Sequence, residues 1–309
     1  MALSDAFHYL GVATSCYLLA QITQHLYCYL RPSSLQRYRA PGKESWALVT
    51  GASDGIGLGF AQELCKRGFN VFLHGRSREK LLRVQEQLRA EYPSAKTKII
   101  VFDAAGPTDH IVEIAHDVGD AHLTVLINNV GGGDMVSPAF KRLEDMTQAE
   151  VQGVISLNAI FMTELTRVLL PILEKNEPSL IINISSASST GLPWLSVYGS
   201  AKGYVDSFSN ALNAEMRAEG RKVEVLGIRV GSTSTPKYPV ATGLFTPTSR
   251  TMASAALDRV GCGRSLVWGY WGHAIQRTCF DWLPEKIVQA IITKYMKDLK
   301  NIDEKKKQE

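Results

Sequence analysis

The chain has 309 residues, of which 45% are hydrophobic and 21% charged, the composition of an ordinary folded protein with a sizeable core. A net charge of +4 is too small to indicate a nucleic-acid-binding protein, and the basic excess is concentrated near the C-terminus. Five cysteines are scattered without CxxC or zinc-type spacing, so the sequence predicts neither a disulfide framework nor a metal site.

The N-terminal segment is unusually apolar. Residues 6–30 contain no Asp, Glu, Lys or Arg, and a helix of that length can span a bilayer. Four basic residues follow this segment and one acid, Asp5, precedes it, an asymmetry that places the C-terminal side in the cytosol. We expect a membrane-anchor helix and linker over residues 1–44. The alternative is an apolar helix packed against the body of the protein or against a partner.

Beyond residue 44 the sequence alternates short β-rich segments with longer helical ones. We expect strands over residues 46–49, 70–73, 97–102, 124–127, 180–184, 223–228 and 265–268. Helices are expected between the strands, among them residues 57–67, 78–92, 151–173 and 197–219. This alternation predicts one doubly wound α/β domain with a parallel, Rossmann-type sheet, over residues 45–283.

Two further segments complete the domain organisation. Residues 231–250 are rich in Pro, Gly, Ser and Thr and are too long for a simple connection, so we expect a binding loop or lid. Residues 284–309 are expected to form a last helix, opened by Pro284, and a basic tail.

A glycine-rich motif, TGASDGIG, follows the first expected strand directly. Gly51 allows a tight turn, Gly55 lets the backbone approach a phosphate, and Gly57 permits close packing of helix on strand. The N-terminus of the next helix adds amide donors and a favourable dipole. The motif therefore predicts a site for a dinucleotide pyrophosphate.

The ends of the second and third strands indicate which dinucleotide binds. An NAD site usually carries an acid after the second strand, whereas this chain has Arg76 and Arg78 there and no acid before Glu79. Arginines can bind a 2′-phosphate, so NADP(H) is favoured, although Arg78 can also be read as a solvated residue at a helix start. Asp103 ends the third strand, where it can bond the adenine edge or cap the next turn.

The most informative stretch is Tyr198-Gly199-Ser200-Ala201-Lys202. A tyrosine and a lysine four residues apart lie on one face of a helix, and a nearby ammonium lowers the pKa of a phenol. Such a tyrosine can transfer a proton to or from a carbonyl or alcohol. Asn158 is expected on a helix, and if that face of the helix packs inward, its side chain needs a partner such as a backbone carbonyl or water.

Other polar residues follow strand ends. The side chains of Asn128 and Asn129 can stabilise the sheet or border the cofactor crevice, and Ser185 and Ser186 lie at the carboxyl edge where ligands bind.

Together, TGASDGIG, NNVG, Asn158, the NISS strand end and YGSAK resemble the short-chain dehydrogenase/reductase family over roughly residues 45–268. The N-terminal segment, NNVG and the GYWGHAIQ…LPEKIV stretch are similar to its membrane-anchored branch, the 17β-hydroxysteroid dehydrogenases and very-long-chain 3-oxoacyl-CoA reductases of the endoplasmic reticulum.

The resemblance implies a role for each catalytic residue. Tyr198 would be the general acid/base, and Lys202 would lower its pKa and hold the nicotinamide ribose. Asn158 would support a water relay to Lys202, and a serine would orient the substrate carbonyl. Counting 13 positions back from the tyrosine gives Ser185, whereas the second serine of the strand-end pair is Ser186. We favour Ser186, which implies a one-residue deletion in residues 187–197.

The resemblance also implies the cofactor contacts. In the segment after the sixth strand, Val230 replaces the family's usual proline, and Thr235 matches a threonine that contacts the carboxamide. The residues expected to bind NADP(H) are Gly51, Ser53, Asp54, Gly55, Ile56, Gly57, Arg76, Asp103, Asn129, Tyr198, Lys202, Val230 and Thr235.

The predicted function is NADPH-dependent reduction of a lipophilic ketone, of the 3-oxoacyl-CoA or 17-oxosteroid class, to its alcohol. The expected partners are that substrate, a membrane and a second copy of the chain, with no nucleic acid. The expected location is the endoplasmic reticulum membrane with the catalytic domain in the cytosol, and Lys306 and Lys307 look like a cytosolic retrieval signal. The alternative is a catalytically inactive relative that acts as an interaction protein or only binds NADPH.

Overall fold

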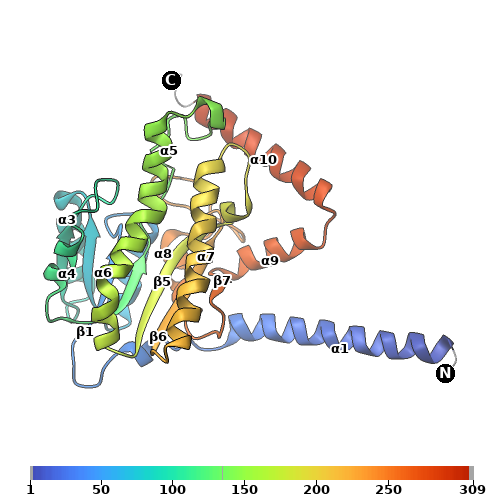
Figure 1. Ribbon diagram of the computed structural model, residues 1–309, viewed down its shortest axis with the longest axis horizontal. Helices are drawn as coiled ribbons and strands as arrows, with labels where there is room; N and C mark the ends of the chain where they lie inside the picture. The colour runs from blue at the N-terminus through green and yellow to red at the C-terminus, as the bar shows by residue number, and fades with distance from the viewer. Residues whose placement is uncertain (1–2, 134, 306–309) are drawn as a thin grey trace.

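Seven parallel strands form one sheet at the centre of the structure, a computed structural model that describes residues 3–133 and 135–305 (Figure 1). The strands are β1 (Ser45–Thr50), β2 (Asn70–Gly75), β3 (Thr97–Val101), β4 (His122–Asn128), β5 (Ser179–Ser186), β6 (Val223–Val230) and β7 (Leu266–Trp268). Their order is β3-β2-β1-β4-β5-β6-β7. All seven strands predicted from the sequence are confirmed, as is the doubly wound α/β fold.

Helices connect the strands and extend both ends of the chain. They are α1 (Leu3–Leu30), α2 (Gly55–Lys66), α3 (Arg78–Glu91), α4 (Val112–Val118), α5 (Gln148–Ile155), α6 (Phe161–Lys175), α7 (Ser196–Ala218), α8 (Ser249–Asp258), α9 (Trp271–Asp281) and α10 (Glu285–Lys305). Short helical turns lie at Leu35–Tyr38, Leu143–Asp145, Ser156–Ile160 and Ala187–Thr190. Lys306 and Lys307, the expected retrieval signal, lie outside the described residues.

The helices bury the sheet on both faces. Helices α2, α3 and α8 pack against one face, where Phe60, Leu81 and Met252 are fully buried. Helices α4, α6 and α7 cover the other face, with Ile114 and Leu165 among the buried side chains there. Because both faces are covered, the central strands β1 and β4 are buried along almost their whole length rather than at alternate residues.

The sheet topology determines where a ligand can bind. From β1 the chain continues to β2 on one side of β1, and it returns to β4 on the other side. The loops after β1 and β4 therefore diverge at the carboxyl edge of the sheet and leave a crevice between them. The glycine motif, Arg76, Asp103, Asn129 and the serine pair follow or end strands at this edge.

Helix α1 projects away from the domain, and its apolar side chains are exposed all around it (Figure 1). In the described part of the chain, the stretch that is long and apolar enough to cross a membrane is Gln148–Lys175, which comprises α5 and α6 and is partly buried in the domain. Helix α1 does not reach that hydropathy, because polar residues interrupt its apolar sequence.

The segment after α1, expected to be a linker, is packed onto the domain. Leu35 and Tyr38 lie in a short helical turn and are 1% exposed. The Ser33 hydroxyl donates to the carbonyl oxygen of Leu257 (2.6 Å), and the Arg259 guanidinium donates to the backbone carbonyl of Cys28. These contacts fix the C-terminal end of α1 to helix α8.

Three further elements differ from the expected ones. The single helix expected over residues 151–173 is interrupted by a π-helical turn, Ser156–Ile160, a feature frequent at functional sites. The expected loop of residues 231–250 ends earlier, because Arg250 already belongs to α8. Helix α9 lies between β7 and α10, where the sequence analysis placed no element.

Candidate active site

The glycine motif forms the turn between β1 and α2. Gly51 and Gly55 have φ of +66° and +57°, a left-handed backbone that favours glycine. A Cβ at Gly57 would lie 2.1 Å from the Gly51 carbonyl oxygen, so only glycine allows this close approach. Asp54 caps α2, its carboxylate accepting from the Gly55 N–H (2.7 Å). The turn thus directs the N-terminus of α2 toward the crevice, a suitable position for a phosphate.

The loop after β4 closes the other side of this turn. The Thr50 hydroxyl accepts from the backbone N–H groups of Asn129 (2.8 Å) and Val130 (2.9 Å), and the Asn129 amide donates to the Thr50 carbonyl oxygen (2.9 Å). Asn129 therefore borders the crevice. Asn128 is buried and donates to Thr166 and Asn183 instead, so it stabilises the sheet.

Basic side chains gather beside the glycine turn. Arg76 is exposed at the carboxyl end of β2. Burial and the neighbouring charges of Arg76 and Lys80 lower the pKa of Lys237, whereas Asp54 opposes that shift. Lys237 comes from the loop between β6 and α8, so three cations from three segments lie close together. Sequence reasoning identified Arg76 and missed Lys80 and Lys237, because nothing in the sequence brings residue 237 to residue 76.

Two other predicted cofactor residues lie near the same crevice. Asp103 is exposed after β3 and accepts from the Ala105 N–H (3.1 Å), so it caps that turn. The Thr235 side chain lies 3.8 Å from the point that a Cβ at Gly55 would occupy. The loop after β6 therefore contacts the glycine turn.

The two candidate serines point in different directions from the end of β5. The Ser185 hydroxyl is buried and donates to the backbone carbonyl of Lys202 in α7 (3.1 Å). The Ser186 hydroxyl accepts from the Ser188 N–H (3.1 Å) and opposes the rise in the pKa of the nearby Tyr198 phenol. This geometry favours Ser186 as the serine beside the tyrosine. Sequence reasoning missed Ser188, whose backbone N–H donates to the Ser186 hydroxyl and whose own hydroxyl is buried.

The pKa of Tyr198 departs from the expectation. Burial raises this pKa above its ordinary value, and the nearby hydroxyls of Ser186 and Ser188 oppose the rise. The expected lowering by Lys202 is not seen. The Lys202 ammonium lies 5.8 Å from the centre of the tyrosine ring and donates to the Ile184 carbonyl oxygen (2.9 Å). Tyr198 is consequently protonated at neutral pH, the form that a proton donor needs.

Lys202 and Asn158 meet next to Gly131. Burial lowers the pKa of Lys202 to about 8, although Asp206 opposes this. Asn158 is 1% exposed in the π-helical turn, accepts from the Gly132 N–H (2.9 Å) and donates to the carbonyl oxygens of Gly132 and Val154 (2.9 Å each). A Cβ at Gly131 would lie 2.6 Å from the Asn158 Oδ1 and 2.8 Å from the Lys202 Nζ.

The loop between β6 and α8 is held at its start by His273 of α9, another residue that sequence reasoning missed. His273 is buried, its Nδ1 accepts from the Gly231 N–H (3.1 Å) and its Nε2 lies 3.0 Å from the Ser232 carbonyl oxygen. The backbone start of this loop is therefore fixed at the end of β6. Val230 precedes it and pairs with Ser186 in the sheet.

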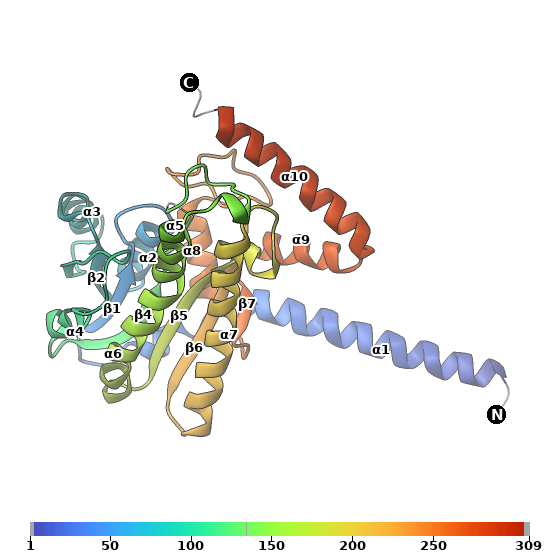
Figure 2. The same cartoon turned by 45° about the horizontal axis from the view of Figure 1, so that its top comes forward.

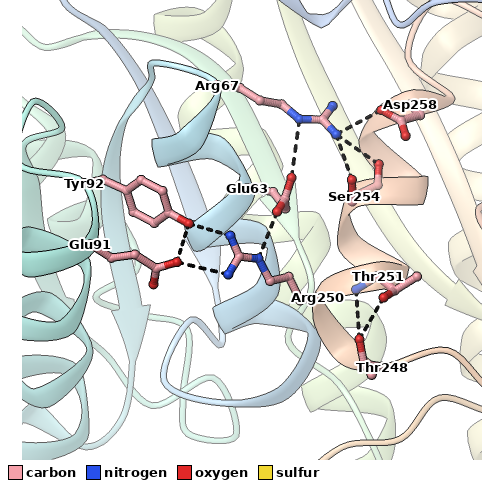
Figure 3. A network of polar contacts seen from close by, with 9 residues as sticks. All are labelled: Glu63, Arg67, Glu91, Tyr92, Thr248, Arg250, Thr251, Ser254 and Asp258. Atoms are coloured by element: carbon pink, nitrogen blue, oxygen red, sulfur yellow. Dashed lines mark hydrogen bonds and ion pairs between the residues drawn. The ribbon is translucent and has the colours of Figure 1, made fainter. Parts of the chain in front are cut away.

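The other end of the loop is held by the network in Figure 3. Arg250 forms ion pairs with Glu63 (3.0 Å) and Glu91 (3.0 Å) and donates to the Tyr92 hydroxyl. Glu63 is buried in α2, the helix that starts at the glycine turn. The network connects α8 with α2 and α3, so the loop that carries Lys237 is tied to the helix that follows the glycine turn.

These features form a cradle that fits a dinucleotide phosphate. A glycine turn without room for a Cβ, a helix N-terminus and three nearby cations suit the pyrophosphate and a 2′-phosphate. The hydroxyls of Tyr198 and Ser186 lie at the same edge of the sheet, where a carbonyl substrate would meet the cofactor.

The sequence is similar to those of known dehydrogenases and reductases. A family model described as short chain dehydrogenase matches residues 45–239. A very-long-chain 3-oxoacyl-CoA reductase from Anas platyrhynchos is 32% identical over 266 residues, covering 84% of this chain and 82% of that protein. Hydroxysteroid dehydrogenase-like protein 1 from Gallus gallus is 34% identical over 247 residues, covering 78% of this chain and 73% of that protein.

Solved structures share the fold. One, from a study of 7β-hydroxysteroid dehydrogenase stereoselectivity, has a TM-score of 0.70 at 20% identity and covers 80% of this chain and 96% of that chain. A metagenomic short-chain oxidoreductase in complex with NADP has a TM-score of 0.60 at 27% identity, covering 73% of this chain and 96% of that chain. The chain therefore belongs to the short-chain dehydrogenase/reductase family of oxidoreductases.

Proposed function

We propose that this enzyme uses NADPH to reduce a lipophilic ketone to its alcohol, with Tyr198 as the general acid. The observation that carries the proposal is the convergence of Tyr198, Ser186 and Lys202 at the carboxyl edge of the sheet, beside a phosphate cradle. An interaction protein without catalysis would have no need for this arrangement. The cation cluster around Arg76 supports NADPH over NADH.

Each side chain has a distinct task in the proposed mechanism. NADPH, when bound, supplies the hydride. The Ser186 hydroxyl orients the substrate carbonyl, and the Tyr198 phenol gives its proton to the oxygen on which negative charge develops. Lys202 and Asn158 then return a proton from solvent to Tyr198. Lys202 suits this task because a pKa of about 8 lets it gain and lose a proton near neutral pH.

We propose 3-oxoacyl-CoAs as the first substrates to test and 17-oxosteroids as the second. Relatives named very-long-chain 3-oxoacyl-CoA reductase are about 30% identical to this chain over most of its length, which supports the acyl-CoA class. Purified full-length enzyme would be screened with NADPH against both classes and against simple ketones, following NADPH oxidation.

Tyr198→Phe tests the mechanism because it removes only the hydroxyl. General acid catalysis is typically worth about 10²–10⁴ in rate, so this variant is expected to lose at least that much while it still binds NADPH. Tyr204→Phe is the matched control. Tyr204 lies on the same helix but is 44% exposed and bonds Thr163 instead. Near-normal turnover by folded Tyr198→Phe would refute the mechanism.

We also propose that α1 anchors the enzyme in the endoplasmic reticulum membrane with the catalytic domain in the cytosol. The exposure of its apolar side chains all around the helix supports this location. Carbonate extraction is expected to leave the full-length protein in the membrane pellet, with a protease-accessible C-terminus in intact microsomes. Release into the supernatant would refute the anchor, and a protected C-terminus would refute the orientation.

We further propose a homodimer. Helices α5, α6 and α7 present an apolar groove of about 600 Å³ in which Ile155, Ile160 and Tyr204 are exposed. A self-complementary contact there would bury this surface. Ile160→Glu is expected to halve the molecular mass measured by light scattering of the solubilised protein. A monomeric wild-type protein would refute the dimer.

A further inference from the structure

The corner between α9 and α10 is the most exposed apolar feature of the domain. Trp282 is 80% exposed, the highest value for a large hydrophobic side chain among the described residues. Leu283, Ile287 and Ile291 follow it and are also exposed. These four residues, here called the elbow, form an apolar patch at a helix turn, and soluble proteins rarely leave such a patch uncovered.

The C-terminal half of helix α10 contacts the domain. Its N-terminal half, which carries part of the elbow, is left exposed. Met296 is 2% exposed, the Lys300 ammonium lies 5.3 Å from the centre of the Trp194 ring, and the Asp303 carboxylate accepts from the Ala139 N–H (2.9 Å). Trp194 and Ala139 belong to the loops that flank the active site. Helix α10 therefore runs from the active-site loops out to the elbow.

The base of α1 adjoins the base of α9. The Tyr29 hydroxyl donates to the Trp268 carbonyl oxygen (2.8 Å), and α9 begins three residues later at Trp271. The Arg259 guanidinium lies 4.6 Å from the centre of the Tyr29 ring and holds this end of α1 in place. In both views α1 and the corner of α9 and α10 project from the same side of the domain (Figure 1 and Figure 2).

The lengths of α1 and α9 indicate which residues of α1 lie as far from the domain as the elbow does. Helix α9 has 11 residues and is about 16 Å long at about 1.5 Å per residue. Measured from its base, α1 covers a similar length over residues 21–30, about 15 Å. The polar residues Gln21, Thr23, Gln24 and His25 lie in this stretch. The outer residues 3–20 are about 27 Å long, close to the roughly 30 Å hydrocarbon thickness of a bilayer.

We propose that the elbow is a second membrane contact, which sits among the lipid headgroups at the level where α1 enters the bilayer. Residues 21–30 then form a stalk outside the hydrocarbon, a position that suits Gln21, Gln24 and His25. Tryptophan is the side chain most suited to this boundary, because its ring is apolar and its N–H can bond to headgroups or water. The proposal rests on the membrane location proposed above.

Tryptophan quenching in vesicles tests this without any need for activity. Full-length protein would be reconstituted in phosphatidylcholine vesicles whose acyl chains are brominated near the headgroup end. The chain has five tryptophans, and Trp282→Phe is expected to remove most of the quenching. Trp194→Phe, at the other end of α10, is the matched control and is expected to leave the quenching unchanged.

The possible results separate the two proposals. A protein that does not bind the vesicles refutes both the anchor and the elbow contact. A bound protein whose quenching is the same with and without Trp282 refutes the elbow contact alone. A second copy of the chain could instead cover the elbow. In that case Trp282 stays unquenched and Trp282→Glu changes the size of the solubilised protein, which also refutes the proposal.

Discussion

Gly131→Ala is a sharp test of the proton path because the added methyl group reaches two proposed catalytic side chains at once. The new Cβ would lie 2.6 Å from the Asn158 Oδ1 and 2.8 Å from the Lys202 Nζ, closer than atoms in contact allow. Gly131 does not have a left-handed φ, so alanine fits the backbone and the collision is the only strain. Both polar atoms must move away from their present partners.

The size of the effect follows from the bonds that would be lost. A displaced Lys202 loses its bond to the Ile184 carbonyl oxygen, and a displaced Asn158 loses the Gly132 N–H. A hydrogen bond to a charged group is worth about 1.5–3 kcal/mol, and about 1.4 kcal/mol is a tenfold change in rate. We therefore expect kcat to fall about ten- to a hundredfold, measured by NADPH oxidation with a saturating ketone. Because side-chain ends can shift, the free energy of unfolding should change much less than the rate.

Gly133→Ala is the matched control two residues further along. A Cβ at Gly133 meets nothing within 4 Å among the described atoms, so this variant is expected to keep normal turnover. Equal losses of turnover in both variants would mean that any side chain added to this loop is harmful. The loss in Gly131→Ala would then not come from its contact with Asn158 and Lys202, which would contradict the argument. Normal turnover by Gly131→Ala would refute the reasoning that Asn158 and Lys202 must hold these positions.

Other variants test the cofactor site, Lys202 and the network around Arg250. Replacing Arg76 and Lys237 with alanine should weaken NADPH binding about tenfold or more in a titration and leave NADH binding unchanged; an equal loss for both cofactors would contradict the 2′-phosphate assignment. Without cofactor, the wild type should gain stability relative to Lys202→Met as the pH rises from about 8 to 10.5. Between these values the folded state has lost a proton that the unfolded state keeps, and the gain is up to about 3 kcal/mol in urea unfolding. A flat difference between the two proteins would mean that the Lys202 pKa is not lowered. Arg250→Leu should cost about 1–3 kcal/mol because it removes a partner of buried Glu63, whereas Arg83→Leu, which breaks an exposed pair with Glu79, should cost less than about 1 kcal/mol; equal costs would contradict the argument.

The fold was predictable because buried parallel strands leave a strong pattern. Each strand is a short apolar run, as in β1 and β4, and each is followed by a helix of a different period. Motif residues at strand ends must come together in such a sheet, because all carboxyl ends lie at one edge. Lys237 could not be predicted in the same way. It lies in an irregular loop whose path depends on His273 and Arg250 at its two ends. These contacts join residues far apart in the sequence, so the hydrophobic pattern of the sequence does not indicate them.

The membrane segment shows where composition is an incomplete guide. Residues 6–30 lack charge, yet polar residues along the whole of α1, from His8 to His25, make it less apolar than a typical membrane-spanning helix. From composition alone, these polar residues make α1 a weaker candidate for a membrane anchor. In the elbow proposal the polar residues between 21 and 25 belong to a stalk outside the hydrocarbon. The domain boundary at residue 44 stays a prediction, although Leu35 and Tyr38 are already buried in the domain.

The choice between Ser185 and Ser186 shows why counting along a loop fails where strand geometry succeeds. Successive side chains of a strand point to opposite faces, so one of the two serines must point away from Tyr198. Ser185 donates to the Lys202 carbonyl oxygen behind the site, and Ser186 lies on the side of the phenol, whose pKa it affects. The loop that follows bends through Gly191 and through Trp194, whose φ of 60° is a strained conformation for a bulky residue. Because Ser186 lies on the side of the phenol, Ser186→Ala should lower kcat far more than Ser185→Ala. The reverse order would mean that the catalytic serine is the one 13 positions before Tyr198, and not the one on the strand face toward Tyr198.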